Sequence, residues 1–149
     1  MSRNDSRWES IRVDSQLDPT DVDVAPIDSG LHSYNQRAAD LASIRRWACY
    51  AKSSEGNLVG GALARWWGTA CELQQIWVDE ALRRRGIGAL LMQRVEALAI
   101  ECGCRLIYLD TFSFQAPELY YRLGYETACR LDGFPGGGSK FILRKALIS

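Results

Sequence analysis

Residues 76–91 constrain the fold of this chain more than any other stretch. They comprise an apolar run, a charged loop with three consecutive arginines, the glycine pair Gly86 and Gly88, and the apolar start of a helix. Such an order leaves backbone N–H groups and the positive end of a helix dipole free to meet an anion. Glycine lets the backbone approach that anion closely. The stretch therefore predicts a pyrophosphate-binding site between a strand and a helix.

Length and charge exclude several classes of protein. A chain of 149 residues is typical of one domain, so we expect a single domain over 1–149, with disorder at 1–7. The formal net charge is zero, which argues against a nucleic-acid partner. No apolar run approaches the roughly 20 residues that span a membrane, so no membrane partner is expected.

The cysteines and the single histidine, His32, bear on metals and on cellular location. Five cysteines are an odd number without a regular spacing, and one histidine cannot complete a zinc site with them. We therefore expect no metal, reduced thiols and a cytoplasmic protein.

Hydrophobic periodicity and turn residues predict a mixed sheet. The segment at 70–78 should run parallel to the one at 105–110, because a helix connects them. Asp28 or Ser29 is expected to cap the first helix. The order predicts an α+β fold, a mixed sheet of six to seven strands with helices on both faces. The predicted strands are 9–17, 46–52, 58–67, 70–78, 105–110, 126–131 and 140–145, and the predicted helices are 26–41, 87–102 and 116–123.

Three motifs together resemble the GNAT superfamily of N-acetyltransferases, in particular a bacterial subgroup of unassigned substrate. Arg83-x-x-Gly86-x-Gly88 matches the Arg/Gln-x-x-Gly-x-Gly/Ala motif of that superfamily. It lies between the apolar strand end at 76–78 and a helix that ends at a glycine before the next strand. The segment at 116–125, with Ala116, Tyr120 and Gly124, resembles a further family motif. The resemblance implies a GNAT-like fold and acetyl transfer from acetyl-CoA to an amine.

The resemblance also implies a set of residues that bind acetyl-CoA as cosubstrate. The strand end would contact the pantetheine arm through its main chain, and the glycine loop would hold the pyrophosphate. Ser113 stands where many members carry asparagine and offers one hydrogen bond. The implied cofactor-binding residues are Ile76, Trp77, Val78, Arg83, Arg84, Arg85, Gly86, Ile87, Gly88, Ala89, Ser113 and Ala116. A solvated basic loop is the alternative for the three arginines.

Two residues are the predicted catalytic pair. Tyr120 occupies the family position from which a phenol protonates the departing thiolate. Glu72 lies where some members place a glutamate base, and simple strand alternation puts it on one face with Gln74, Ile76 and Val78. Packing is the alternative for Tyr120, and a surface position is the alternative for Glu72. Asp110, at the end of a central strand, is the second candidate base.

The acceptor is not specified by these motifs. Aromatic residues in several loops favour a partly apolar or cationic small molecule with a primary amine. A protein acetyltransferase and a catalytically idle acyl-CoA-binding module are the alternatives, and a homodimer is left open. The expected acceptor residues are the helix segment 31–35, Trp66, Trp67, the loop 112–114 and Phe134.

Overall fold

A computed structural model describes residues 11–147. The disorder expected at 1–7 lies outside these residues. The chain divides into two compact units, Met1–Leu41 and Ala42–Ser149. The single domain over 1–149 stays a prediction, and each unit is described by itself below.

Residues 11–41 of the first unit contain one α-helix, α1 (Asp21–Ala38), which begins five residues earlier than predicted. Thr20 forms a capping box with Asp23, in which each side chain bonds the backbone of the other residue. This cap replaces the predicted caps Asp28 and Ser29, which lie inside the helix. Pro26 also lies inside the helix, so the predicted start at residue 26 is wrong. The capping box gives two backbone N–H groups hydrogen-bond partners, and the helix therefore begins after Thr20 and not at Pro26.

The predicted strand at 9–17 is wrong over its described part. Residues 11–17 form no strand, and residues 9 and 10 lie outside the described range. The pattern consists of Ile11, Val13 and, less regularly, Leu17. This weak alternation does not suffice, because a strand needs a neighbour for its N–H and C=O groups.

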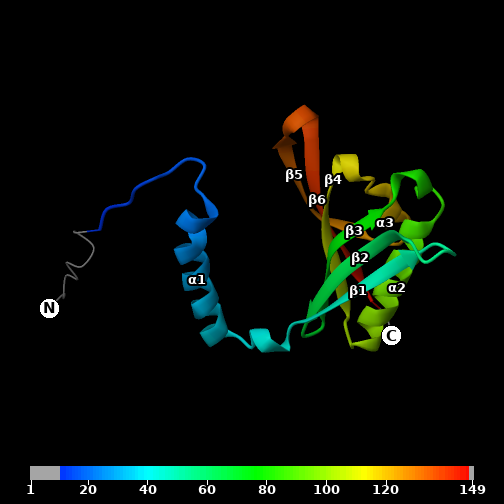
Figure 1. The fold of residues 1–149 in the computed structure, drawn as a ribbon, viewed down its shortest axis with the longest axis horizontal. Coiled ribbons are helices and arrows are strands. Elements are labelled where there is room, and N and C mark those ends of the chain that lie inside the picture. Colours follow the sequence, from blue (N-terminus) through cyan, green and yellow to red (C-terminus); the bar gives the residue numbers. More distant parts are fainter. Residues whose placement is uncertain (1–10, 148–149) are drawn as a thin grey trace. The chain divides into compact units, whose positions relative to one another are not determined.

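The second unit is built on one mixed sheet of six strands, which confirms the predicted fold class (Figure 1). The strand order is β1-β2-β3-β4-β6-β5, and β3 with β4 is the parallel pair, as expected. The strands and helices of this unit are β1 (Arg45–Lys52), β2 (Leu58–Trp67), β3 (Ala70–Val78), α2 (Ile87–Glu101), β4 (Leu106–Phe112), α3 (Glu118–Arg122), β5 (Glu126–Phe134) and β6 (Gly138–Ala146).

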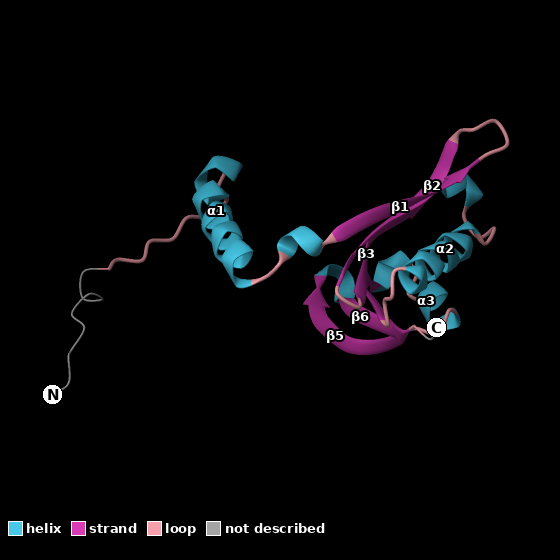
Figure 2. Cartoon of the chain, turned by 90° about the horizontal axis from the view of Figure 1, so that it is seen from below, coloured by secondary structure: helices cyan, strands magenta, loops and turns pink. Residues whose placement is uncertain are grey.

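Both α2 and α3 pack on one face of this sheet, which we call the core face (Figure 2). Within this unit, helices therefore cover one face of the sheet, whereas helices on both faces were expected. Met92 and Val95 of α2 are fully buried against Ala64, Ile107 and Leu143 of the sheet. The opposite face of the sheet, which we call the open face, carries polar and aromatic side chains. No helix among the described residues is long and apolar enough to cross a membrane.

Candidate active site

The parallel strands β3 and β4 separate along their length and so open a groove. They pair only over Ala70–Glu72 and Leu106–Tyr108, and β4 then continues beside β6. The part of β3 beyond Glu72 and the end of β4 line a groove of about 1100 Å³, which we call the donor groove. Its other walls are the loop before α2, the first turn of α2 and one side of α3.

A β-bulge at Gln74 accompanies this separation. Leu63 of β2 faces Gln75, whereas the next residue, Ala64, faces Leu73, so Gln74 is an extra residue in β3. Bulges bend a strand and increase its twist. The adjacent strand approaches closely at Gly60, where a β-carbon would lie 2.9 Å from the carbonyl oxygen of Trp77. Glycine at this position lets β2 approach the Trp77 backbone, which lines the groove.

The glycine loop forms an anion cradle at one end of the donor groove. Gly86 is the N-cap of α2, has a φ of 81° and makes no side-chain capping bond. The first-turn N–H groups at Ile87, Gly88 and Ala89 therefore face the groove without a capping side chain. Arg84 is also left-handed, with a φ of 62°. Alternating backbone conformations of this kind gather N–H groups into an anion-binding nest, so the cradle fits a pyrophosphate.

The three arginines of the loop differ in position. Arg83 and Arg84 line the donor groove, and Arg85 does not. Arg83 Nε donates to the carbonyl oxygen of Val78 at 3.1 Å, which ties the loop to the end of β3. Arg83 thus combines a structural bond with a charge at the groove, a combination that the sequence pattern did not indicate.

Tyr120 of α3 lies at the inner wall of the donor groove, with only 5% of its surface exposed. Its ring packs edge-to-face on Tyr125, with 5.8 Å between the ring centres. Burial raises the pKa of Tyr120 above the ordinary value of 10.0. The phenol is therefore protonated at neutral pH, and within residues 11–147 its hydroxyl has no hydrogen-bond partner. A buried, oriented and protonated phenol can donate a proton into the groove.

Glu72 lies on the open face of the sheet and outside the walls of the donor groove. The bulge at Gln74 reverses the alternation of side chains after Leu73. Ile76 pairs with Ala62 of β2, which is buried on the core face, whereas Glu72 pairs with Arg65, which lies on the open face. The expectation that Glu72 shares a face with Ile76 and Val78 is therefore wrong, because both of those residues pack against the core. Glu72 nevertheless belongs to the last β3–β4 pair, at the point where the donor groove begins.

The second candidate base, Asp110, lines the donor groove. Its carboxylate forms an ion pair of 2.8 Å with Lys140 of β6, and its side chain is 58% exposed. Ser113 does not line the groove, and its hydroxyl accepts a hydrogen bond of 3.1 Å from the Ser139 backbone. Ala116, by contrast, lines the groove in a left-handed conformation with a φ of 58°. Two of the twelve expected cofactor-binding residues, Arg85 and Ser113, thus lie off the groove wall.

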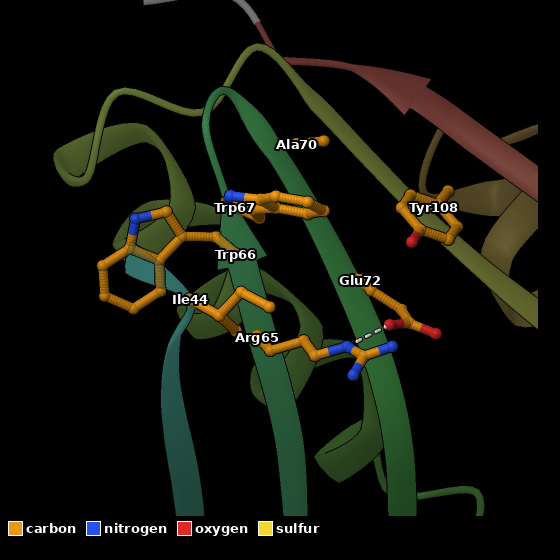
Figure 3. A pocket seen from close by; sticks show the side chains of 7 residues that line it. All are labelled: Ile44, Arg65, Trp66, Trp67, Ala70, Glu72 and Tyr108. Atoms are coloured by element: carbon orange, nitrogen blue, oxygen red, sulfur yellow. Dashed lines mark hydrogen bonds and ion pairs between the residues drawn. The ribbon is translucent and has the colours of Figure 1, made fainter. Parts of the chain in front are cut away.

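A second, smaller hollow of about 220 Å³ lies on the open face beside Glu72, and we call it the open-face pocket (Figure 3). Arg65 Nε donates to Glu72 Oε2 at its base, and Trp67 and Tyr108 flank it. Sequence reasoning missed Arg65 and Tyr108, because only the register of β2, β3 and β4 brings them to Glu72. The pocket is lined by Ile44, Arg65, Trp66, Trp67, Ala70, Glu72 and Tyr108.

The sheet splits beside an uncapped helix N-terminus, with a buried phenol in the split, and this arrangement fits an acyl-CoA-dependent transferase. Comparisons with known proteins agree. The model of the acetyltransferase (GNAT) family matches residues 11–125. The chain therefore belongs to the GNAT family of acetyltransferases, whose members use acetyl-CoA.

Individual relatives and solved structures are named acetyltransferases. A blasticidin-S acetyltransferase from Streptomyces morookaense is 35% identical over 125 residues, covering 76% of this chain and 92% of the relative. The crystal structure of an acetyltransferase from Bacillus cereus is 31% identical with a TM-score of 0.75, covering 90% and 98% of the two chains. An aminoglycoside 6'-N-acetyltransferase complexed with coenzyme A shares the fold at 21% identity and a TM-score of 0.62, covering 91% and 97%.

Proposed function

We propose that this protein transfers the acetyl group of acetyl-CoA directly to a primary amine of a small molecule. The observation that carries the proposal is the donor groove, which joins the uncapped helix N-terminus to the buried Tyr120. The cradle at Ile87, Gly88 and Ala89 would hold the pyrophosphate, with Arg83 and Arg84 adding positive charge. The backbone at 76–78 would run beside the pantetheine arm.

In the proposed reaction the amine nitrogen attacks the thioester carbonyl carbon. The new C–N bond forms, the C–S bond breaks, and the thiolate leaves. Tyr120 donates its proton to that thiolate, and Glu72 accepts the proton that the amine loses, directly or through one water molecule. A backbone N–H near Trp77 or Val78 would stabilise the oxyanion.

Two observations support a small-molecule acceptor over a protein. The open-face pocket beside Glu72 is small and has aromatic walls. A relative at 35% identity is named for acetylating blasticidin S. A cytoplasmic location stays a prediction from the cysteines, all five of which are free thiols. A homodimer also stays untested.

The cradle is tested by comparing Gly86→Ala with Gly103→Ala. These glycines cap opposite ends of α2 with φ values of 81° and 80°, and a β-carbon at either meets no atom within 4 Å. Both variants should lose a similar roughly 1–2 kcal/mol of stability, because both force alanine into a left-handed conformation. Only at Gly86 does the new methyl group project beside the expected pyrophosphate. Calorimetry should therefore show an acetyl-CoA Kd raised at least about tenfold in Gly86→Ala and unchanged in Gly103→Ala.

Two results would contradict the proposal. The wild-type protein could fail to bind acetyl-CoA, which would remove the donor. Alternatively, both glycine variants could bind acetyl-CoA with the wild-type Kd, which would remove the cradle as its site.

A further inference from the structure

The open-face pocket contains two opposite charges that are only partly engaged with each other. Arg65 uses Nε to reach Oε2 of Glu72. Within residues 11–147, the two terminal guanidinium nitrogens of Arg65 and Oε1 of Glu72 have no hydrogen-bond partner. The two side chains are 45% and 27% exposed, so a ligand can reach both. The pocket thus offers a donor fork and a carboxylate oxygen side by side.

This charge balance discriminates between classes of ligand. A simple cation would meet a carboxylate that Arg65 already neutralises, with a further positive charge at Arg46, which lies opposite Arg65 in the β1–β2 register. A simple anion would meet a guanidinium that Glu72 already neutralises. A molecule that carries an ammonium and a carboxylate a few bonds apart can pair with both groups at once. The arrangement therefore favours a zwitterion.

The walls of the pocket limit the rest of the ligand. Trp67 and Tyr108 are 45% and 36% exposed and stand on either side of Ala70, whose small side chain leaves space between them (Figure 3). The volume of about 220 Å³ lies below the roughly 300–1,000 Å³ of sites for drug-sized ligands. Aromatic walls of this size suit one small group and its apolar stem.

We propose that the open-face pocket binds the aminocarboxylate group of an amino-acid-like acceptor, with the carboxylate on the free guanidinium nitrogens of Arg65. The amine of the same group lies on the Glu72 side. Glu72 directly precedes Leu73, the first residue of β3 in the wall of the donor groove. The amine is thereby presented at the end of the groove where the two strands meet. This inference rests on the proposed acetyl transfer, and it assigns Arg65 as the residue that selects the acceptor.

The test compares amino acids with the amines that remain when their carboxylate is removed. Suitable pairs are L-phenylalanine with 2-phenylethylamine and L-lysine with 1,5-diaminopentane, each assayed for kcat/KM with acetyl-CoA. In the wild-type enzyme, kcat/KM for the better amino acid should exceed kcat/KM for its paired amine at least about 30-fold. The paired amine lacks the carboxylate and therefore cannot make the charge-assisted bidentate contact with Arg65. The preference should fall to within about threefold in Arg65→Met. The ratio cancels any general effect of the substitution on folding or on Glu72.

Arg46→Met is the matched control, because it removes a guanidinium from the neighbouring position of the same face and should keep the preference. Arg65→Lys keeps the positive charge but removes the two-pronged guanidinium donor, and it should retain only part of the preference for amino acids. Acetylation of amines without any preference for the carboxylate would overturn this inference and leave the proposed function standing. A preference that survives Arg65→Met would also overturn it. No acetylation of any amine would overturn both.

Discussion

Replacing Tyr120 with phenylalanine is expected to lower kcat by about 10²–10⁴-fold, the usual contribution of a general acid. The substitution removes one oxygen atom and keeps the ring that packs on Tyr125. The fold and the cradle should therefore persist, and calorimetry should give an acetyl-CoA Kd within about threefold of the wild-type value. Stopped or continuous assays of thiol release with a saturating amine would measure kcat.

Tyr121→Phe is the matched control for this variant. Tyr121 is the next residue of α3, but its hydroxyl lies 2.8 Å from the Thr127 hydroxyl, and Tyr121 is absent from the groove wall. Its loss should leave kcat nearly unchanged. Equal kcat values for wild type and Tyr120→Phe would remove Tyr120 from the chemistry and leave it a packing residue.

The pH dependence of kcat provides a second test of Tyr120 as the general acid. Burial raises its pKa above 10.0, so the folded enzyme keeps the proton to higher pH than a free tyrosine does. A general acid must be protonated to act. The alkaline limb of kcat that depends on Tyr120 should therefore begin only above about pH 10 and should be missing in Tyr120→Phe.

Replacing Glu72 with glutamine should lower kcat/KM by about 10²–10³-fold. The amide keeps the size of the side chain but cannot accept a proton from the amine. Glu72 lies at the end of the donor groove, on the face that carries the open-face pocket. Measurement of kcat/KM between about pH 5 and 9 with one fixed amine tests this.

Asp110→Asn is the discriminating comparison. Asp110 lines the donor groove, so it is the only other carboxylate considered as the base. If Glu72 is the base, the Asp110 variant keeps most of its kcat/KM. A large loss of kcat/KM in Asp110→Asn, together with a wild-type kcat/KM in Glu72→Gln, would transfer the role to Asp110.

Local signals in the sequence predicted the backbone of the glycine loop and the start of α2. A glycine at the N-cap of α2 and an uncapped first turn follow from short-range pattern alone, because the backbone conformation depends on neighbouring residues. The boundaries of β2 and β3 were predicted to the residue for the same reason. Tyr120 was singled out by its place in the motif at 116–125, and it lies in the groove wall.

The open-face pocket and its surroundings could not be predicted in this way, because they depend on strand register. One extra residue, Gln74, decides which face of the sheet Glu72 occupies. The Asp110–Lys140 ion pair joins residues 30 positions apart through the β4–β6 pairing. Arg65 meets Glu72 only because β2 and β3 pair as they do. No periodicity within one segment carries that information.

Acetyl transfer itself is tested most directly by the stoichiometry of one reaction. The purified chain would be incubated with acetyl-CoA and a panel of primary amines, with free thiol and acetylated amine measured on the same samples by thiol titration and mass spectrometry. We predict one acetylated amine for each thiol released, with both products lost in Tyr120→Phe. Thiol release without an acetylated amine, or no product of either kind from any amine, would contradict the account.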